Sequence, residues 1–72
     1  MNDKITKNLQ LGRNIFKFRK LKGLSQNQLA ELLGISREHL AKIETAKRCV
    51  SLGLLFDIAD TLEIKVKDFF EF

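Results

Sequence analysis

The sequence predicts a compact all-α domain built from five short helices. Apolar residues recur at spacings of three and four along most of the chain, which is the period of one helix face. Serines flanked by apolar residues stand where several of these periodic segments would begin. No segment alternates apolar and polar residues as a strand does, so the helices must pack on one another.

The first helix is expected over residues 9–22, and residues 1–8 are expected to form a flexible N-terminal arm. Ile15 and Phe18 fall on one face of this helix. Gly23 follows it and can adopt the left-handed conformation that ends many helices.

Three further helices are expected to begin at serines. Ser25 can cap the second helix, with Gln28 three residues on as its capping-box partner. Ser36 and Ser51 repeat the same chemistry. A weaker start follows at Lys65, which is a poor capping residue, so the last helix has the weakest local signal.

One apolar face of each helix is expected to form a single small core, so residues 1–72 are expected to be one domain. The residues predicted to be buried are Ile15, Phe18, Leu29, Ala30, Leu33, Leu40, Ile43, Leu55, Ile58, Ala59, Leu62 and Phe69.

Basic residues are concentrated in the first third of the chain. Residues 1–24 hold seven Lys or Arg and one acid, whereas residues 49–72 hold two basic and five acidic residues. This asymmetry favours a polyanionic partner on one face, with nucleic acid as the first candidate. The alternative is that the lysines only solvate the outside of the first helix, and charge alone does not decide between them.

Other classes of protein are disfavoured by what the sequence lacks. No apolar run approaches the roughly 20 residues that span a bilayer, and no secretory signal is evident, so a cytoplasmic protein without membrane contact is expected. The single cysteine, Cys49, and the single histidine do not form a metal-ligand pattern. We expect no metal, no cofactor and no enzyme activity, because no nucleophile, base or phosphate-binding loop is recognisable.

Residues 26–44 read QNQLAELLGISREHLAKIE, which predicts two short helices joined by a tight turn at Gly34. Ala30 is small enough for two steeply crossing helices to approach closely. If Leu40 and Ile43 face inward, the opposite face of the second of these helices is polar and exposed. An exposed helix of this width fits the major groove of duplex DNA.

Side chains on that outward face are candidates for reading bases. Arg37 and Lys42 can donate to guanine O6 and N7, and Glu38 can accept from cytosine N4. Glu38 and Lys42 are also spaced to form a simple surface ion pair, which is the alternative reading. Phosphate contacts are expected from residues at the helix ends and in the following turn: Gln26, Asn27, His39, Thr45, Lys47 and Arg48. Among these, Gln26 is expected to point its amide outward and to fix register.

The chain resembles the Cro/C1-type, lambda-repressor-like helix-turn-helix family over residues 12–70. The resemblance is carried by Arg19, the run LSQNQLAELLGIS from Leu24, Glu44 and the run LFDIADTLEI from Leu55. It implies a five-helix fold with the third helix as the recognition helix, and it adds Ser36 to the base-contacting set. It also implies an internal ion pair between Arg19 and Glu44.

The sequence departs from the family pattern after the third helix. Ala46 and Val50 stand where the family usually has Gly and often Pro. Because alanine at positive φ costs about 1 kcal/mol relative to glycine, the turn is expected to differ.

Six phenylalanines are more than the small core can hide. Either the terminal helix folds back and buries some of them, or apolar edges of the helices over residues 51–72 form a two-fold interface. We favour the interface, with Leu52, Phe56, Phe70 and Phe72 as its candidates.

The predicted function is a homodimeric DNA-binding regulator on a two-fold symmetric operator, comparable to phage-type repressors and restriction-modification controllers. The alternative is an antitoxin or other protein-interaction module whose apolar edges bind a partner protein. Replacing both Arg37 and Lys42 by alanine distinguishes the two, because only DNA binding would be lost.

Overall fold

The computed structural model describes the backbone of residues 3–71 and the side chains of residues 7–71. Within this part of the chain there are four α-helices and one 3-10 helix, and no strand. The segments are α1 Asp3–Leu21, α2 Gln26–Leu33, α3 Arg37–Glu44, α4 Leu52–Leu62 and the 3-10 helix η1 Val66–Phe70. None of the described helices is both long and apolar enough to cross a lipid bilayer.

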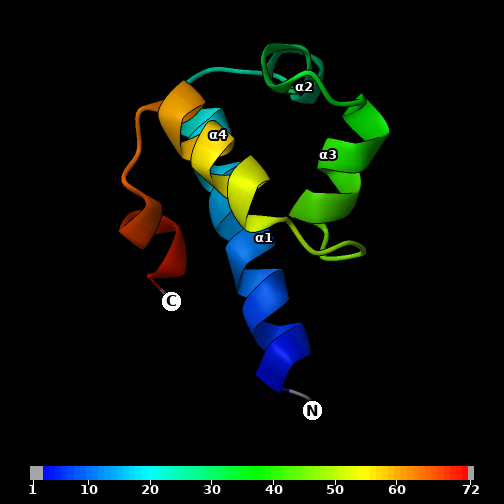
Figure 1. Cartoon of the computed structure of the whole chain (residues 1–72), viewed down its shortest axis with the longest axis vertical. Coiled ribbons are helices and arrows are strands. Elements are labelled where there is room, and N and C mark those ends of the chain that lie inside the picture. Colours follow the sequence, from blue (N-terminus) through cyan, green and yellow to red (C-terminus); the bar gives the residue numbers. More distant parts are fainter. Residues whose placement is uncertain (1–2, 72) are drawn as a thin grey trace.

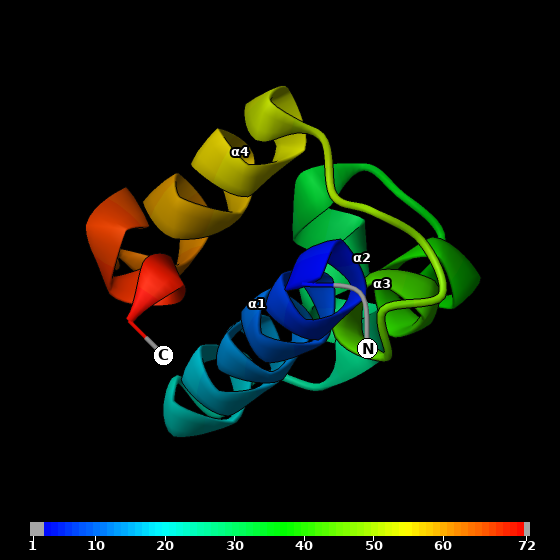
Figure 2. The same ribbon diagram turned by 90° about the horizontal axis from the view of Figure 1, so that it is seen from below.

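The long helix α1 forms the spine of the fold. Helices α2 and α3 pack together on one side, and α4 with η1 covers another side (Figures 1 and 2). The N-terminal end of α1 projects beyond the other elements (Figure 1). This arrangement leaves α3 at the edge of the molecule, on the side away from η1.

The predicted core is confirmed apart from its edge. Ten of the twelve expected residues are buried, and the other two, Phe18 and Leu33, are half-buried against the same cluster. Phe18 packs edge-on against the fully buried Phe69, with ring centroids 5.1 Å apart. The aromatic contact joins α1 to η1, which closes the core at the C-terminal end.

The expected arm over residues 1–8 is wrong for residues 3–8, which are the first part of α1. Residues 1 and 2 lie outside the described part. No Gly or Pro interrupts the chain before Gly12, and the lysines of this stretch and residues 9–11, Leu-Gln-Leu, are good helix formers. Asn8 also donates a hydrogen bond to Cys49 Sγ at 3.2 Å, which attaches this part of α1 to the loop after α3.

The last helix differs from the expected α-helix, because Val66–Phe70 forms a single 3-10 segment. Lys65 gives it no side-chain cap, which agrees with the weak start signal. Asn14 on α1 holds the segment by donating to the carbonyl oxygens of Phe69 at 2.8 Å and Glu71 at 3.1 Å. Tertiary contacts therefore position η1 in place of a local cap.

The prediction that the turn after α3 would differ is wrong for its backbone. Ala46 adopts φ 62°, which is the left-handed conformation that glycine takes more readily. The amide of Lys47 then donates to the carbonyl of Lys42 at 2.8 Å and closes the end of α3. The chain therefore forms a left-handed turn at Ala46, although alanine is more strained than glycine in this conformation.

Replacing Ala46 by glycine is expected to raise the free energy of unfolding by about 1 kcal/mol, because the positive φ is then unstrained. Urea unfolding followed by circular dichroism measures this change. Ala41→Gly, inside α3, is the matched control and is expected to lower stability by about 1 kcal/mol. A loss of stability in Ala46→Gly comparable to that of Ala41→Gly would contradict the strain argument.

Candidate nucleic-acid interface

Two capped helices and the turn between them present α3 to solvent. Ser25 accepts from the amide of Gln28 while the Gln28 side chain accepts from the Ser25 amide, which is the predicted capping box. Gly34 ends α2 at φ 72°, as the tight turn requires. Ala30 is buried at the crossing, and its carbonyl accepts from the Ile35 amide at 3.0 Å.

Helix α3 is divided into a buried and an exposed face. Leu40 and Ile43 are buried in the core, whereas Arg37, Glu38 and Lys42 are exposed. Neither Glu38 nor Lys42 takes part in an ion pair within residues 7–71. Three charged side chains on one accessible helix face are thus available to an external partner.

Ser36 directly precedes α3 and caps its N-terminus. Its hydroxyl oxygen accepts from the amide of His39 at 3.0 Å, as the predicted N-cap. The residue is exposed, so its hydroxyl proton is still accessible from solvent. His39 itself is half-buried, on the flank of α3.

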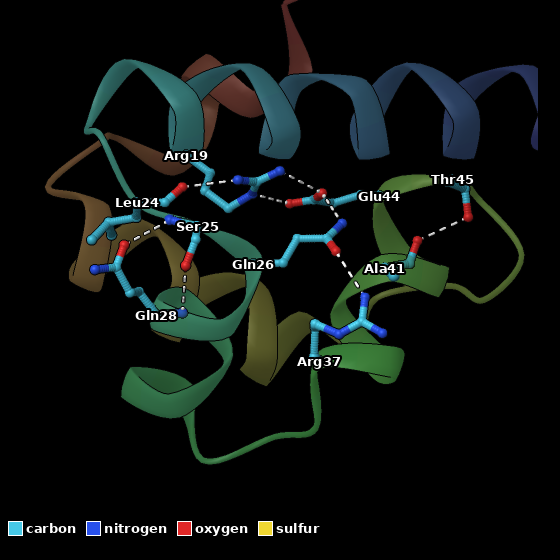
Figure 3. Close-up of polar contacts among 9 residues, drawn as sticks. All are labelled: Arg19, Leu24, Ser25, Gln26, Gln28, Arg37, Ala41, Glu44 and Thr45. Atoms are coloured by element: carbon cyan, nitrogen blue, oxygen red, sulfur yellow. Dashed lines mark hydrogen bonds and ion pairs between the residues drawn. The ribbon is translucent and has the colours of Figure 1, made fainter.

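The buried ion pair implied by the family resemblance is present and joins α1 to α3 (Figure 3). Arg19 Nε lies 2.7 Å from Glu44 Oε2, and Arg19 Nη2 lies 3.1 Å from Glu44 Oε1. The third guanidinium nitrogen donates to the Leu24 carbonyl at 2.8 Å. Both charged residues are about 95% buried, with 4% and 5% of their surface exposed. Such a bidentate, fully hydrogen-bonded pair fixes the angle of α3 against α1.

Gln26 is placed differently from the prediction. Its amide nitrogen donates to Glu44 Oε1 at 2.9 Å, so the side chain turns inward and is half-buried. A buried carboxylate has more hydrogen-bond acceptor sites than Arg19 alone can occupy. The Gln26 amide occupies a further site. Its amide oxygen accepts from Arg37 Nη1 at 3.4 Å (Figure 3). The buried pair is in this way connected to an exposed side chain on α3.

Most of the other predicted phosphate-contacting residues lie at the start of α2, at the end of α3 and in the loop after α3. Asn27 is exposed at the start of α2, and Lys47 and Arg48 are exposed in the loop after α3. Thr45 is exposed at the end of α3, but its hydroxyl donates to the Ala41 carbonyl at 2.8 Å and stabilises the helix end. Asn27, Lys47 and Arg48 are therefore all accessible from solvent.

Phe16 completes the surroundings of the ion pair. The guanidinium carbon of Arg19 lies 5.0 Å from the centroid of the Phe16 ring, which remains 47% exposed. This stacking shields one side of the guanidinium from solvent and favours its charge.

The candidate interface residues of the C-terminal part form a separate surface. Leu52 and Phe56 lie on α4 and Phe70 lies on η1, with 64%, 47% and 49% of their surfaces exposed. The fourth candidate, Phe72, lies outside the described residues. We call Leu52, Phe56 and Phe70 the apolar patch.

No group of three or more His, Cys, Asp or Glu side chains that could hold a metal ion occurs in the described part of the chain.

The family model described as Helix-turn-helix (HTH_3) matches residues 15–69. The chain belongs to this helix-turn-helix family. The match covers the ion pair, α2, α3, α4 and the buried Phe69, and confirms the Cro/C1-type resemblance.

Curated relatives of the helix-turn-helix chain are regulators. An uncharacterized HTH-type transcriptional regulator of Bacillus subtilis, YazB, is 44% identical over 57 residues, which cover 79% of this chain and 83% of the relative. The control protein C.SmaI of Serratia marcescens is 36% identical over 56 residues, covering 78% and 67%. An uncharacterized regulator of Rickettsia conorii is 39% identical over 61 residues, covering 85% and 49%. The chain thus spans about half the length of its Rickettsia relatives.

Two solved structures show the same helix-turn-helix fold. The restriction-modification controller protein C.AhdI from Aeromonas hydrophila has a TM-score of 0.85 and 32% identity, covering 90% of this chain and 98% of that chain. The biofilm regulator SinR in complex with DNA has a TM-score of 0.76 and 30% identity, covering 82% and 95%.

Proposed function

We propose that this helix-turn-helix protein is a sequence-specific double-stranded DNA-binding transcriptional regulator that acts as a homodimer on a two-fold symmetric operator. The observation that carries the proposal is the exposed charged face of α3, held outward by the buried Arg19–Glu44 pair. The likeness to a controller protein and to a DNA-bound regulator supports it.

In this proposal α3 enters the major groove and reads base edges. Arg37 and Lys42 donate to guanine O6 and N7, and Glu38 accepts from cytosine N4. Gln26 holds Arg37 through the 3.4 Å contact, which limits the conformations of the reading side chain before DNA is bound. The Ser36 hydroxyl adds a short contact at the start of the helix.

Phosphates on either side of the groove are bound by groups that border α3. The first amides of α2, at Gln26 and Asn27, point out of the helix end and favour an anion. Lys47 and Arg48 lie exposed in the loop after α3 and are proposed to bind further phosphates. His39 and Thr45 are also proposed to contact phosphates. Binding through such charges is expected to weaken as salt concentration rises.

We place the dimer interface at the apolar patch, with Phe72 as an additional contact. Leu52 and Phe56 lie on α4 and Phe70 on η1, and η1 is on the far side of the fold from α3 (Figure 1), so a second copy there is expected to leave both recognition helices free. The described part of one protomer measures 33 × 24 × 21 Å. Two copies of this size can therefore reach half-sites about one helical turn, ~34 Å, apart.

Replacing Leu52 and Phe56 by glutamate is expected to convert the dimer to a monomer, because buried charge would oppose association. Sedimentation equilibrium at tens of micromolar protein measures the mass. Leu21→Glu with Leu32→Glu is the matched control, since these leucines are 70% and 63% exposed outside the patch. Monomeric unmodified protein, or equal dissociation of the control, would contradict the proposed interface.

Selection of random duplexes by the purified chain, followed by footprinting, tests the function. The expected result is a palindrome whose half-site centres lie about 10 base pairs apart. Recovery of no sequence above the starting pool would contradict sequence-specific binding and would favour the protein-interaction alternative.

A further inference from the structure

The outer face of α1 carries basic side chains that the helix-turn-helix motif does not use. Arg13, Lys17 and Lys20 are all exposed, and their spacings of four and three place them along one side of the helix. The Lys17 ammonium lies 5.5 Å from the centroid of the Phe18 ring, so Lys17 leans toward one edge of this row. We call these three residues the basic stripe.

The basic stripe forms no ion pair with a carboxylate in the described part of the chain. Residues 7–30 contain no Asp or Glu. Within the described side chains, Arg19 is the one cation of α1 that is paired with a carboxylate. The acidic residues of the C-terminal third lie on or beside α4 and η1, and η1 is held by Asn14, three positions before Lys17, so η1 borders the Lys17 edge of the stripe. Arg13 and Lys20, on the other edge, are exposed cations that form no ion pair in the described part of the chain.

The position of the stripe relative to α3 follows from the contact between the two helices. A Cβ added to Gly12 would lie 2.5 Å from the Ile43 carbonyl oxygen, so the α1 and α3 backbones touch there. A helix with its side chains is about 10–12 Å wide. Lys20 follows Arg19, which faces Glu44 on α3. The stripe is thus carried by a helix that packs directly against the recognition helix.

A helix with its side chains is about as wide as the major groove of DNA. With α3 in a major groove about 12 Å wide, a helix packed beside it lies over the phosphates that border the groove. A row of cations on the outside of that helix is complementary to a row of phosphates.

We infer that the basic stripe is a second, sequence-independent phosphate-binding surface that extends the contact of α3 onto the neighbouring DNA backbone. The inference rests on the proposed function of α3 as the recognition helix. Because the stripe contacts phosphates and not bases, it strengthens binding to operator DNA and to random DNA alike.

The test is a salt titration of binding to a fluorescent 30-base-pair duplex of random sequence, measured by fluorescence anisotropy. Arg13→Gln with Lys20→Gln is compared with the charge-matched control Lys65→Gln with Lys67→Gln, whose residues are also exposed but lie at the acidic end. Thermal unfolding of both variants checks that the fold is retained.

The stripe variant is expected to reduce the slope of log K against log salt by about 2 and to raise Kd at 0.1 M salt at least tenfold, roughly 0.9 in slope per phosphate contact. The control is expected to keep the slope of the unmodified chain. Equal slopes for both variants would overturn the inference. If the unmodified chain bound neither the random duplex nor any selected sequence, the proposed function itself would fail.

Discussion

Replacing Arg37 and Lys42 together by alanine is expected to abolish sequence-specific DNA binding while leaving the fold intact. Both side chains are exposed on the outward face of α3 and contribute nothing to the core. Each lost contact to a base edge costs about 1–3 kcal/mol. The affinity for a selected operator is therefore expected to fall by about two to four orders of magnitude.

Fluorescence anisotropy with the selected operator and with a random duplex, at one salt concentration, separates loss of specificity from loss of charge. Lys65→Ala with Lys67→Ala removes the same charge from the acidic end of the chain and is expected to change operator affinity only slightly. Retained preference for the operator in the Arg37 and Lys42 double variant would show that α3 does not read the sequence.

Replacing Glu44 by alanine is expected to lower the free energy of unfolding by about 3–5 kcal/mol. The change leaves the Arg19 guanidinium buried without its carboxylate, and removal of one partner of a buried pair is strongly destabilising. Small domains have total stabilities of only about 5 kcal/mol. Most of the molecules are therefore expected to be unfolded near physiological temperature, as followed by circular dichroism during urea or thermal unfolding.

Two variants control for the position and for the charge. Glu38→Ala removes an exposed carboxylate from the same helix and is expected to change stability by no more than about 0.5 kcal/mol. Arg19→Met with Glu44→Leu removes both charges and is expected to recover much of the lost stability. A Glu44→Ala protein as stable as Glu38→Ala would show that the pair does not hold α1 to α3.

The parts of the fold set by local chemistry could be predicted from the sequence. Ser25, Ser36 and Ser51 cap their helices, and Gly34 takes positive φ, because each depends on residues within three or four positions. The same holds for the core, since the helical period alone places its residues on one face.

Features that depend on distant contacts could not be predicted in this way. Gly12 approaches the α3 backbone, and Asn14 binds the carbonyls of η1, across separations that no local pattern encodes. The inward turn of Gln26 depends on a buried carboxylate 18 positions away. Glu63 adopts φ 57° at the end of α4, where a charged residue gives no sign of a left-handed cap.

Glycine occupies only some of the left-handed turns in the described part of the chain. Gly23 and Gly34 have φ values of 73° and 72°, as expected. Ala46 takes a similar conformation without being glycine, because the amides that follow it close the end of α3. Residue type therefore predicts where such a turn is easy but not where the hydrogen bonds that close a helix end require one.

The proposed DNA binding depends most on α3 being the element that meets the duplex. Amide chemical-shift mapping of the isotopically labelled chain, titrated with its selected duplex, measures this directly. The largest shifts are expected at residues 26–27 and 36–42, with α4 changed little at its surface. Large shifts confined to α4 and η1, with residues 36–42 unperturbed at saturating duplex, would contradict DNA recognition by α3.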